Sequence, residues 1–202
     1  MDFNIILFQI VTLIFSAIIH EYMHGWMADR LGDTTAKDAG RLTLNPISHI
    51  DPLGSILLPA LLVFSGAGFV FGWAKPVPYN PYNLSDKKYG SAKVAAAGPL
   101  ANLFTAIFFG LILRFFPFVN VELSTLFIII VQINILLMVF NLVPIPPLDG
   151  SKVVMPFLPY NLQESYAKLE RYGMILVFVF IMFGFNLIIP IMNFLLKLII
   201  GF

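Results

Sequence analysis

The chain has 202 residues, of which 59% are hydrophobic and only 11% are charged, and its formal net charge is +1. A soluble domain is about 45–50% apolar and about 25% charged, so this composition predicts an integral membrane protein. The small net charge excludes a nucleic-acid partner, because no basic patch is large enough to collect phosphates. The absence of cysteine excludes disulfides, thiolate nucleophiles and cysteine-based metal sites.

The first apolar segment covers about residues 3–28 and ends in His20-Glu21-Tyr22-Met23-His24. It lacks a basic start and a small-residue cleavage site, so we expect it to be retained rather than removed as a signal peptide. In this H-E-x-x-H pattern both imidazoles project from one face of a helix. The spacing suits one divalent cation, most often zinc, with the glutamate placed to take a proton from metal-bound water. Ionisable side chains at membrane depth are costly, which favours a functional role.

An apolar run over residues 52–73 follows a polar stretch and contains helix breakers, namely Pro59, Gly66, Gly68 and Gly72. If every basic group of the chain is cytoplasmic, this run must enter and leave the membrane on the same side. We therefore expect a re-entrant element, because non-helical backbone is tolerated at depth where protein or a cavity covers it. A complete span is the alternative. The basic groups concerned lie at 30–41, 75–93 and 152–171.

Three prolines in residues 74–81 disfavour a helix there and favour an extended edge segment. Residues 190–202 are too short for a crossing and predict a half-span or an interfacial helix. The expected fold is an all-α polytopic membrane protein with about five to six membrane segments, a re-entrant element and a short β-like edge segment near the active site. Further spans of about 20 residues are expected near 91–116, 123–143 and 171–189.

Two histidines do not complete a catalytic zinc site, which usually has a third protein ligand and water. Glu122 lies at the opposite end of its helices, and the carboxylates of 160–171 have basic neighbours typical of a solvated face. Asp149 follows the 123–143 helix and the prolines that end it. The charge pattern returns Asp149 to the side of the two histidines, which makes it the best third ligand, although Asp149-Gly150 is also compatible with a simple turn.

Two elements together resemble the site-2 protease family of intramembrane metalloproteases, which pairs H-E-x-x-H on one transmembrane helix with N-x-x-P…L-D-G on another. In this chain the second element reads Asn141-Leu142-Val143-Pro144-Ile145-Pro146-Pro147-Leu148-Asp149-Gly150. The resemblance extends to the A-G-P-x-x-N pattern at 96–102 and, for a compact prokaryotic branch, to 40–52 and 71–78. It covers roughly residues 10–155 and leaves no room for an inserted PDZ or CBS domain. One membrane-embedded domain is thus expected over 1–202, with a catalytic core at about 3–155 and C-terminal helices at about 165–202.

Carried over to this chain, the resemblance implies that His20, His24 and Asp149 bind one Zn²⁺ per chain. It also implies that Glu21 is the general base, which takes a proton from the water and delivers it to the leaving amine. Asn141 is implied to hydrogen-bond the substrate backbone or the oxyanion.

A second set of residues is assigned to substrate binding. The resemblance implies that Lys75, Pro76 and Val77 offer a strand edge to an unwound substrate helix, because β-addition satisfies the amides that unwinding frees. Asn102 is either close to the site or a polar contact that holds helices together. His49 is expected to be a hydrogen-bond donor to a metal ligand, a residue that contacts the substrate or a solvated loop residue.

The expected function is that of a zinc endopeptidase that cleaves in or near transmembrane segments of membrane proteins, as in regulated intramembrane proteolysis. We expect it in the cell membrane as a multi-pass protein, with the active site toward the cytoplasmic side and with a transmembrane protein as substrate. A zinc transporter or another non-enzymatic metal-binding membrane protein is the alternative. It is disfavoured because transport rarely needs a glutamate beside the first histidine, and because no ionisable relay leads to the far side. A catalytically inactive scaffold is disfavoured because every chemical component is present.

Overall fold

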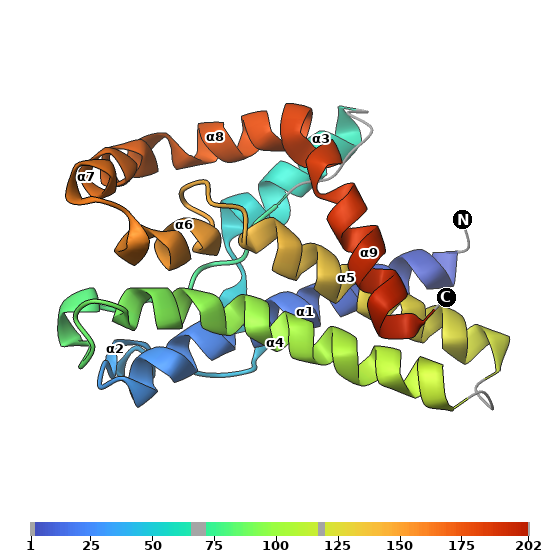
Figure 1. Cartoon of the computed structure of the whole chain (residues 1–202). Coiled ribbons are helices and arrows are strands. Elements are labelled where there is room, and N and C mark those ends of the chain that lie inside the picture. The colour runs from blue at the N-terminus through green and yellow to red at the C-terminus, as the bar shows by residue number, and fades with distance from the viewer. Residues whose placement is uncertain (1–2, 66–71, 117–119, 202) are drawn as a thin grey trace.

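The computed structural model describes residues 3–65, 72–116 and 120–201, and its regular structure over these ranges is entirely helical (Figure 1). The α-helices are α1 (Phe3–Arg30), α2 (Thr35–Asp38), α3 (Leu58–Phe64), α4 (Gly90–Phe115), α5 (Val121–Asn141), α6 (Asp149–Val154), α7 (Tyr160–Leu169), α8 (Gly173–Val179) and α9 (Ile189–Ile200). Short 3₁₀ turns lie at Pro46–His49, Pro81–Asn83, Met155–Phe157, Glu170–Tyr172 and Phe185–Leu187, and π-helical turns lie at Pro52–Leu57 and Phe180–Gly184.

The expected all-α membrane fold is confirmed. Four helical stretches within the described residues are long and apolar enough to cross a membrane, and Ile189–Ile200 is a shorter apolar helix. Large apolar side chains on their outer faces, such as Phe104 and Phe183, are exposed, as suits helices surrounded by lipid. The fourth stretch begins earlier than expected, because the polar residues after Tyr160 continue helically into the apolar part. The four stretches are Phe3–Arg30, Gly90–Phe115, Val121–Asn141 and Tyr160–Leu187.

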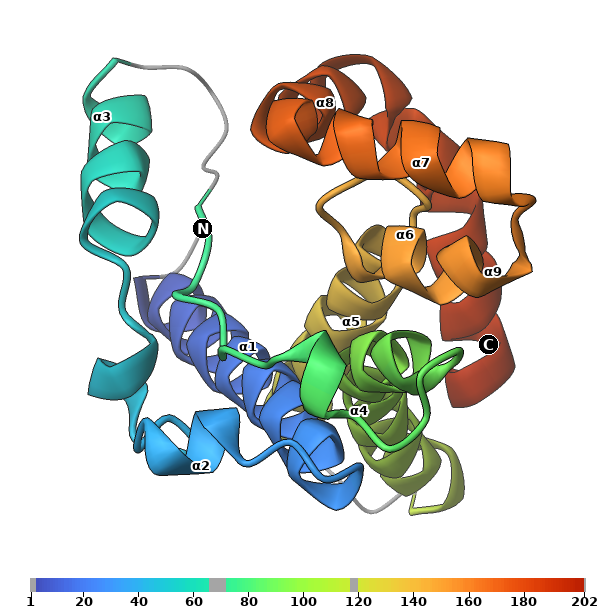
Figure 2. The same ribbon diagram turned by 90° about the vertical axis from the view of Figure 1, so that its left-hand side faces the viewer.

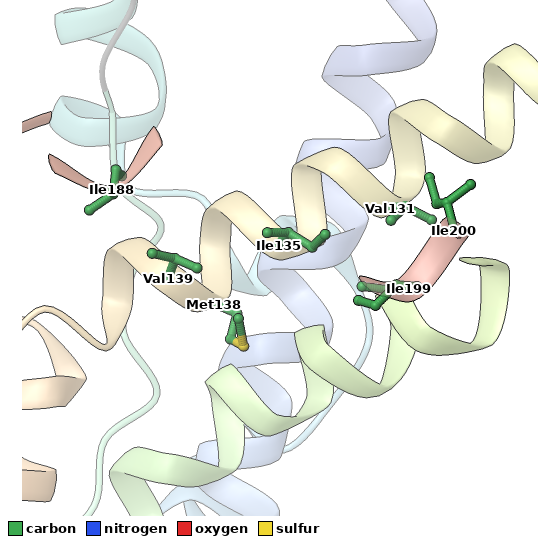
Figure 3. Packing of buried hydrophobic residues seen from close by; sticks show 8 residues of the cluster. Val131, Ile135, Met138, Val139, Ile188, Ile199 and Ile200 are labelled. Atoms are coloured by element: carbon green, nitrogen blue, oxygen red, sulfur yellow. The ribbon is translucent and has the colours of Figure 1, made fainter. Parts of the chain in front are cut away.

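Helix α4 lies at the centre of the bundle and contacts α1, α5, α6 and α9. Small buried residues line it, including Ala95, Ala97 and Gly98, and such residues let membrane helices approach closely. Gly110 marks another close approach, since a Cβ there would lie 2.1 Å from Ile199 Cγ2 of α9. An apolar cluster fills the space between α4, α5 and α9, and Figure 3 labels seven of its members, Val131, Ile135, Met138, Val139, Ile188, Ile199 and Ile200.

The two ends of the 52–73 run lie side by side. The Trp73 N–H donates to the Gly54 carbonyl at 3.2 Å, and the Ser55 hydroxyl donates to the Trp73 carbonyl at 2.9 Å. Asp51 caps the first turn by accepting from the amides of Leu53 and Gly54. A re-entrant element requires such neighbouring ends, but residues 66–71, with Gly66 and Gly68, lie outside the described residues, so re-entrance stays a prediction. Figure 2 shows α3 on one side of the bundle and α6 to α8 on the other.

The extended segment expected before α4 is also present. Residues 72–80 adopt no helical structure, and they form no ladder with any described part of the chain. The β-like edge segment is therefore extended backbone rather than an assigned strand. Its prolines explain both properties, because proline interrupts a helix and cannot donate to a ladder.

Candidate metal centre

Three possible metal ligands converge where the last third of α1 meets the start of α6. Asp149 Oδ2 lies 3.0 Å from His20 Nε2 and 3.3 Å from His24 Nε2. The ring centroids of the two histidines are 4.6 Å apart, as the i, i+4 spacing on one helix face requires. Asp149 is the first residue of α6, directly after the proline-rich loop that follows α5.

The outer nitrogen of each imidazole is hydrogen-bonded to α4. His24 Nδ1 lies 2.7 Å from the Val94 carbonyl, and His20 Nδ1 lies 2.6 Å from Asn102 Oδ1. A carbonyl oxygen can only accept, so His24 carries a proton on Nδ1, and Nε2 is the nitrogen that faces Asp149. His20 and Asn102 are buried. Both Nε2 atoms face Asp149, and the hydrogen bonds at Nδ1 orient the rings as such bonds orient metal-ligating histidines.

Gly98 leaves the space in which these ligand atoms meet. A Cβ at this position would lie 2.6 Å from His20 Nε2 and 2.6 Å from both Cε1 and Nε2 of His24. Two imidazole nitrogens and one carboxylate oxygen, held at close quarters and without cysteine, are a ligand set that zinc accepts in catalytic sites. The residues present thus fit a zinc ion.

Glu21 lies beside the proposed metal ligands, and the extended segment before α4 holds its carboxylate. Its carboxylate and the imidazoles of His20 and His24 each offer a ligand atom, all within 4.8 Å of one another. Glu21 Oε2 accepts a hydrogen bond of 2.9 Å from the Val77 N–H. The Val77 side chain is buried against Gly25 of α1. A Cβ on Gly25 would lie only 2.8 Å from Val77 Cγ1, so the close contact depends on glycine at this position. The extended segment therefore crosses α1 directly at the motif.

The same segment is fixed at its start by the loop after α2. The Lys75 N–H donates to the His49 carbonyl at 2.9 Å, and Arg41 Nη2 donates to the Lys75 carbonyl at 3.0 Å. Pro76 and Pro78 have no N–H. The amides of Lys75 and Val77 are already bonded, so over 75–78 only carbonyl oxygens could pair with a substrate, and those of Lys75 and Pro76 also accept from Arg41. The buried His49 ring donates to its own loop, from Nε2 to the Thr43 carbonyl at 2.8 Å.

Asn141 ends α5, and its side-chain nitrogen donates to the Leu137 carbonyl of the same helix at 2.9 Å. Its oxygen remains for another partner, so a role toward substrate stays a prediction.

Sequence reasoning missed Asp33, which fixes the far end of the extended segment. Its carboxylate accepts hydrogen bonds from Thr35, from the Asn80 amide at 2.6 Å and from Asn83 Nδ2 at 2.9 Å. Burial alone would raise the pKa of Asp33, but the hydrogen bonds from Thr35, Asn80 and Asn83 outweigh this effect and hold the pKa below its usual value. In the sequence Asp33 resembles any acidic loop residue. Its role becomes visible only in the fold, where residues 80–83 lie beside it and donate hydrogen bonds to its carboxylate.

Asn134 on α5 and Ser16 on α1 were also missed. Both are buried and hydrogen-bonded to each other, and Asn134 is hydrogen-bonded to Asn102. Their signal in the sequence was a polar side chain inside an apolar span, which in membranes faces a partner rather than lipid.

Comparison with known proteins gives one family. Residues 117–185 match the model of "Peptidase family M50". The chain is 39% identical over 180 residues to "Putative zinc metalloprotease YwhC" of Bacillus subtilis (strain 168), covering 85% of this chain and 78% of that protein. It is 36% identical over 162 residues to "Putative zinc metalloprotease MJ0611" of Methanocaldococcus jannaschii, covering 78% and 76%. It is 29% identical over 178 residues to "Putative zinc metalloprotease Rip2" of Mycolicibacterium smegmatis, covering 87% and 67%. No solved structure matches the chain.

Proposed function

Because this chain belongs to Peptidase family M50 and is a zinc-dependent metalloprotease with a multi-pass membrane fold, we propose that it is an intramembrane endopeptidase. Its substrates are membrane proteins, cleaved in or near their transmembrane segments in regulated intramembrane proteolysis. The observation that carries this proposal is that Asp149, at the start of α6, meets His20 and His24, which lie on an apolar helix of spanning length. A metal centre built there acts on a peptide bond at or near the membrane rather than in a soluble cleft.

His20 Nε2, His24 Nε2 and an Asp149 oxygen are the atoms that would hold the zinc ion, one per chain. When bound, zinc supplies a Lewis acid that polarises the peptide carbonyl and lowers the pKa of water toward about 7. The hydrogen bonds that the outer imidazole nitrogens donate to Asn102 Oδ1 and the Val94 carbonyl support this assignment, because such bonds orient metal-ligating histidines.

Glu21 is the general base of the proposed reaction. Its carboxylate lies within reach of the ligand atoms, and the Val77 N–H fixes one of its oxygens. The other oxygen is available to take the proton of the attacking water and to pass it to the leaving amine. Asn141, at the end of α5, is proposed to donate to the substrate carbonyl or backbone from beside the loop that leads to Asp149.

A substrate must be extended before its peptide bond can be cleaved, because a helix shields its carbonyls and occupies their hydrogen bonds. The segment that contains Lys75, Pro76 and Val77 is proposed to receive the extended strand. The backbone groups that it can still offer are carbonyl oxygens, each of which has two lone pairs, so the substrate would supply the N–H donors. His49 supports this segment through its backbone carbonyl.

The proposed location is the cell membrane, with the active site toward the cytoplasm. Three basic groups, 30–41, 75–93 and 152–171, belong to the end of α1, the start of α4 and the elements α6 and α7, which lie at one end of the bundle in Figure 1. The positive-inside rule places this end in the cytoplasm, and the motif lies in the third of α1 nearest to it.

The test replaces Glu21 with Gln and measures cleavage of a model transmembrane substrate in detergent with zinc. We expect turnover to fall by about 10²–10⁴-fold, the usual contribution of a general base, while bound zinc stays at the parent level. Cleavage by Glu21→Gln at the parent rate would refute the mechanism. A zinc transporter predicts no cleavage by either protein.

A further inference from the structure

A continuous chain of buried polar side chains leads from His20 into the middle of α5. Asn102 Nδ2 donates to Asn134 Oδ1 at 2.9 Å and to the Ser16 carbonyl at 3.3 Å. Asn134 Nδ2 donates to Ser16 Oγ at 3.0 Å and to the Ile130 carbonyl at 2.9 Å. Asn102 and Asn134 are 0% and 1% exposed, so every unpaired group here would be costly.

The direction of this chain is fixed by two backbone carbonyls. The Ile130 carbonyl only accepts, so the side-chain nitrogen of Asn134 must face it and the side-chain oxygen must face Asn102. The side-chain oxygen of Asn134 and the Ser16 carbonyl are both acceptors, so the side-chain nitrogen of Asn102 must face them. The oxygen of Asn102 is then left to face His20 Nδ1, at 2.6 Å. It can only accept from His20, so Nδ1 carries a proton and Nε2 is the nitrogen that faces Asp149, at 3.0 Å.

We propose that Asn134 is a positioning residue for His20, acting through Asn102, so that α5 sets the tautomer and orientation of a metal ligand on α1. This inference rests on the proposed metal centre. The contacts among Ser16, Asn102 and Asn134 would by themselves be enough to attach three helices to one another. The chain of hydrogen bonds instead continues in a single direction to the imidazole, where it holds a proton on His20 Nδ1 and leaves Nε2 as the nitrogen for the proposed metal.

The test compares zinc dissociation constants by competition with a chromophoric chelator in detergent. Asn134→Leu removes the acceptor for Asn102, and we expect zinc binding to weaken by about 10–100-fold, as for other residues behind a metal ligand. Thr125→Val is the matched control on α5, because Thr125 Oγ1 donates only to the Val121 carbonyl of its own helix in the contacts described. The zinc dissociation constant of Thr125→Val should stay within about twofold of the parent value. Should Asn134→Leu fail to fold, Asn134→Ala removes the same acceptor without adding bulk.

Asn134→Asp is the conservative variant, because an aspartate presents an oxygen to Asn102 whether it is protonated or not. We expect it to recover most of the affinity that Asn134→Leu loses. The absorption spectrum of the Co²⁺-loaded protein should change in Asn134→Leu and not in Thr125→Val, since it reports ligand geometry rather than stability.

His20→Ala separates the two levels of the proposal. If His20→Ala binds zinc with the parent affinity, the proposed metal centre is wrong. If His20→Ala loses zinc while Asn134→Leu keeps the parent affinity and Co²⁺ spectrum, the metal centre stands and the role of Asn134 is refuted. Equal weakening in Asn134→Leu and Thr125→Val would likewise overturn it, because both would then act only through packing.

Discussion

Gly98 offers a way to disturb the metal centre without weakening the helix that carries it. In Gly98→Ala the new Cβ would lie 2.6 Å from His20 Nε2 and from His24 Nε2, whereas ordinary contact begins at 3.4 Å, so the imidazoles must retreat by about 0.8 Å. Metal–ligand distances tolerate only about 0.2 Å. The change therefore removes one or both histidines from bonding distance of the metal, and we expect zinc affinity to fall by at least about 100-fold and proteolysis to be lost.

The effect on folding should be much smaller. Alanine is more favourable than glycine in a helix interior by about 1 kcal/mol, whereas a retreat of the imidazoles strains their hydrogen bonds to Asn102 and Val94, each of which contributes about 1 kcal/mol. These contributions have opposite signs, so in the zinc-free protein the unfolding temperature of Gly98→Ala should differ from that of the parent by no more than about 4 °C. The assay is a pair of measurements on one preparation in detergent, namely chelator competition for zinc and thermal unfolding without metal.

Gly110→Ala is the control on the same helix. Its Cβ would lie 2.1 Å from Ile199 Cγ2, in the packing of α4 against α9 and away from the metal ligands. This variant should lose thermal stability and keep its zinc affinity. Zinc binding and cleavage at parent levels in Gly98→Ala would refute the assignment of the ligand set to this space.

Two further changes test the elements around the site. Val77→Pro removes the N–H donated to Glu21 but keeps an extended backbone, and loss of a charge-assisted hydrogen bond of about 1.5–3 kcal/mol should lower kcat by about 10–100-fold with zinc affinity unchanged. Val77→Ala keeps the N–H and should retain kcat within about threefold, and equal rates in the two variants would contradict the role of this amide. Asp33→Asn tests the support of the segment by pH. The pKa of Asp33 is held below its usual value, so its carboxylate stabilises the fold above about pH 4 and the gain is lost as the pH falls further. The unfolding temperature of the parent should thus fall more steeply than that of Asp33→Asn below about pH 4, and parallel curves would contradict the prediction.

The positions of the long helices could be predicted well, because a membrane span requires a run of consecutive apolar residues and such a run is visible directly in the sequence. The spans near 91–116 and 123–143 correspond to α4 and α5 within two residues at either end. The meeting of Asp149 with the two histidines could also be anticipated, since it needs only the side of the membrane to which each helix end returns. The structure brings Asp149 Oδ2 to 3.0 Å from His20 Nε2.

Contacts that depend on the rotation of one helix against another could not be anticipated. Asn134 is one polar residue in an apolar span, and only the rotation of α5 brings it to Asn102. Val77 lies in an extended segment, and the space beside Gly25 lets its N–H reach Glu21. In both cases the deciding quantity is a side-chain direction fixed by packing between distant segments. Hydropathy and spacing along the chain carry no information about it.

Helix α4 contacts the elements that carry all three proposed ligands, the two histidines of α1 directly and Asp149 through α6. Val94, Gly98 and Asn102 follow one another at four-residue intervals and so share a face of this helix. Val94 meets His24, Asn102 meets His20, and Gly98 lies between both imidazoles. The two histidines are thus held by one long helix against another. Asp149 instead begins the short α6 after a proline-rich loop. Helix α6 in turn packs on α4, and a Cβ on its Gly150 would lie 2.1 Å from the Leu142 carbonyl oxygen, so the carboxylate is also held by close packing. All three proposed ligands therefore depend on contacts with α4, and a substitution on the face that carries Gly98 should affect the metal centre more than one on the opposite face of this helix.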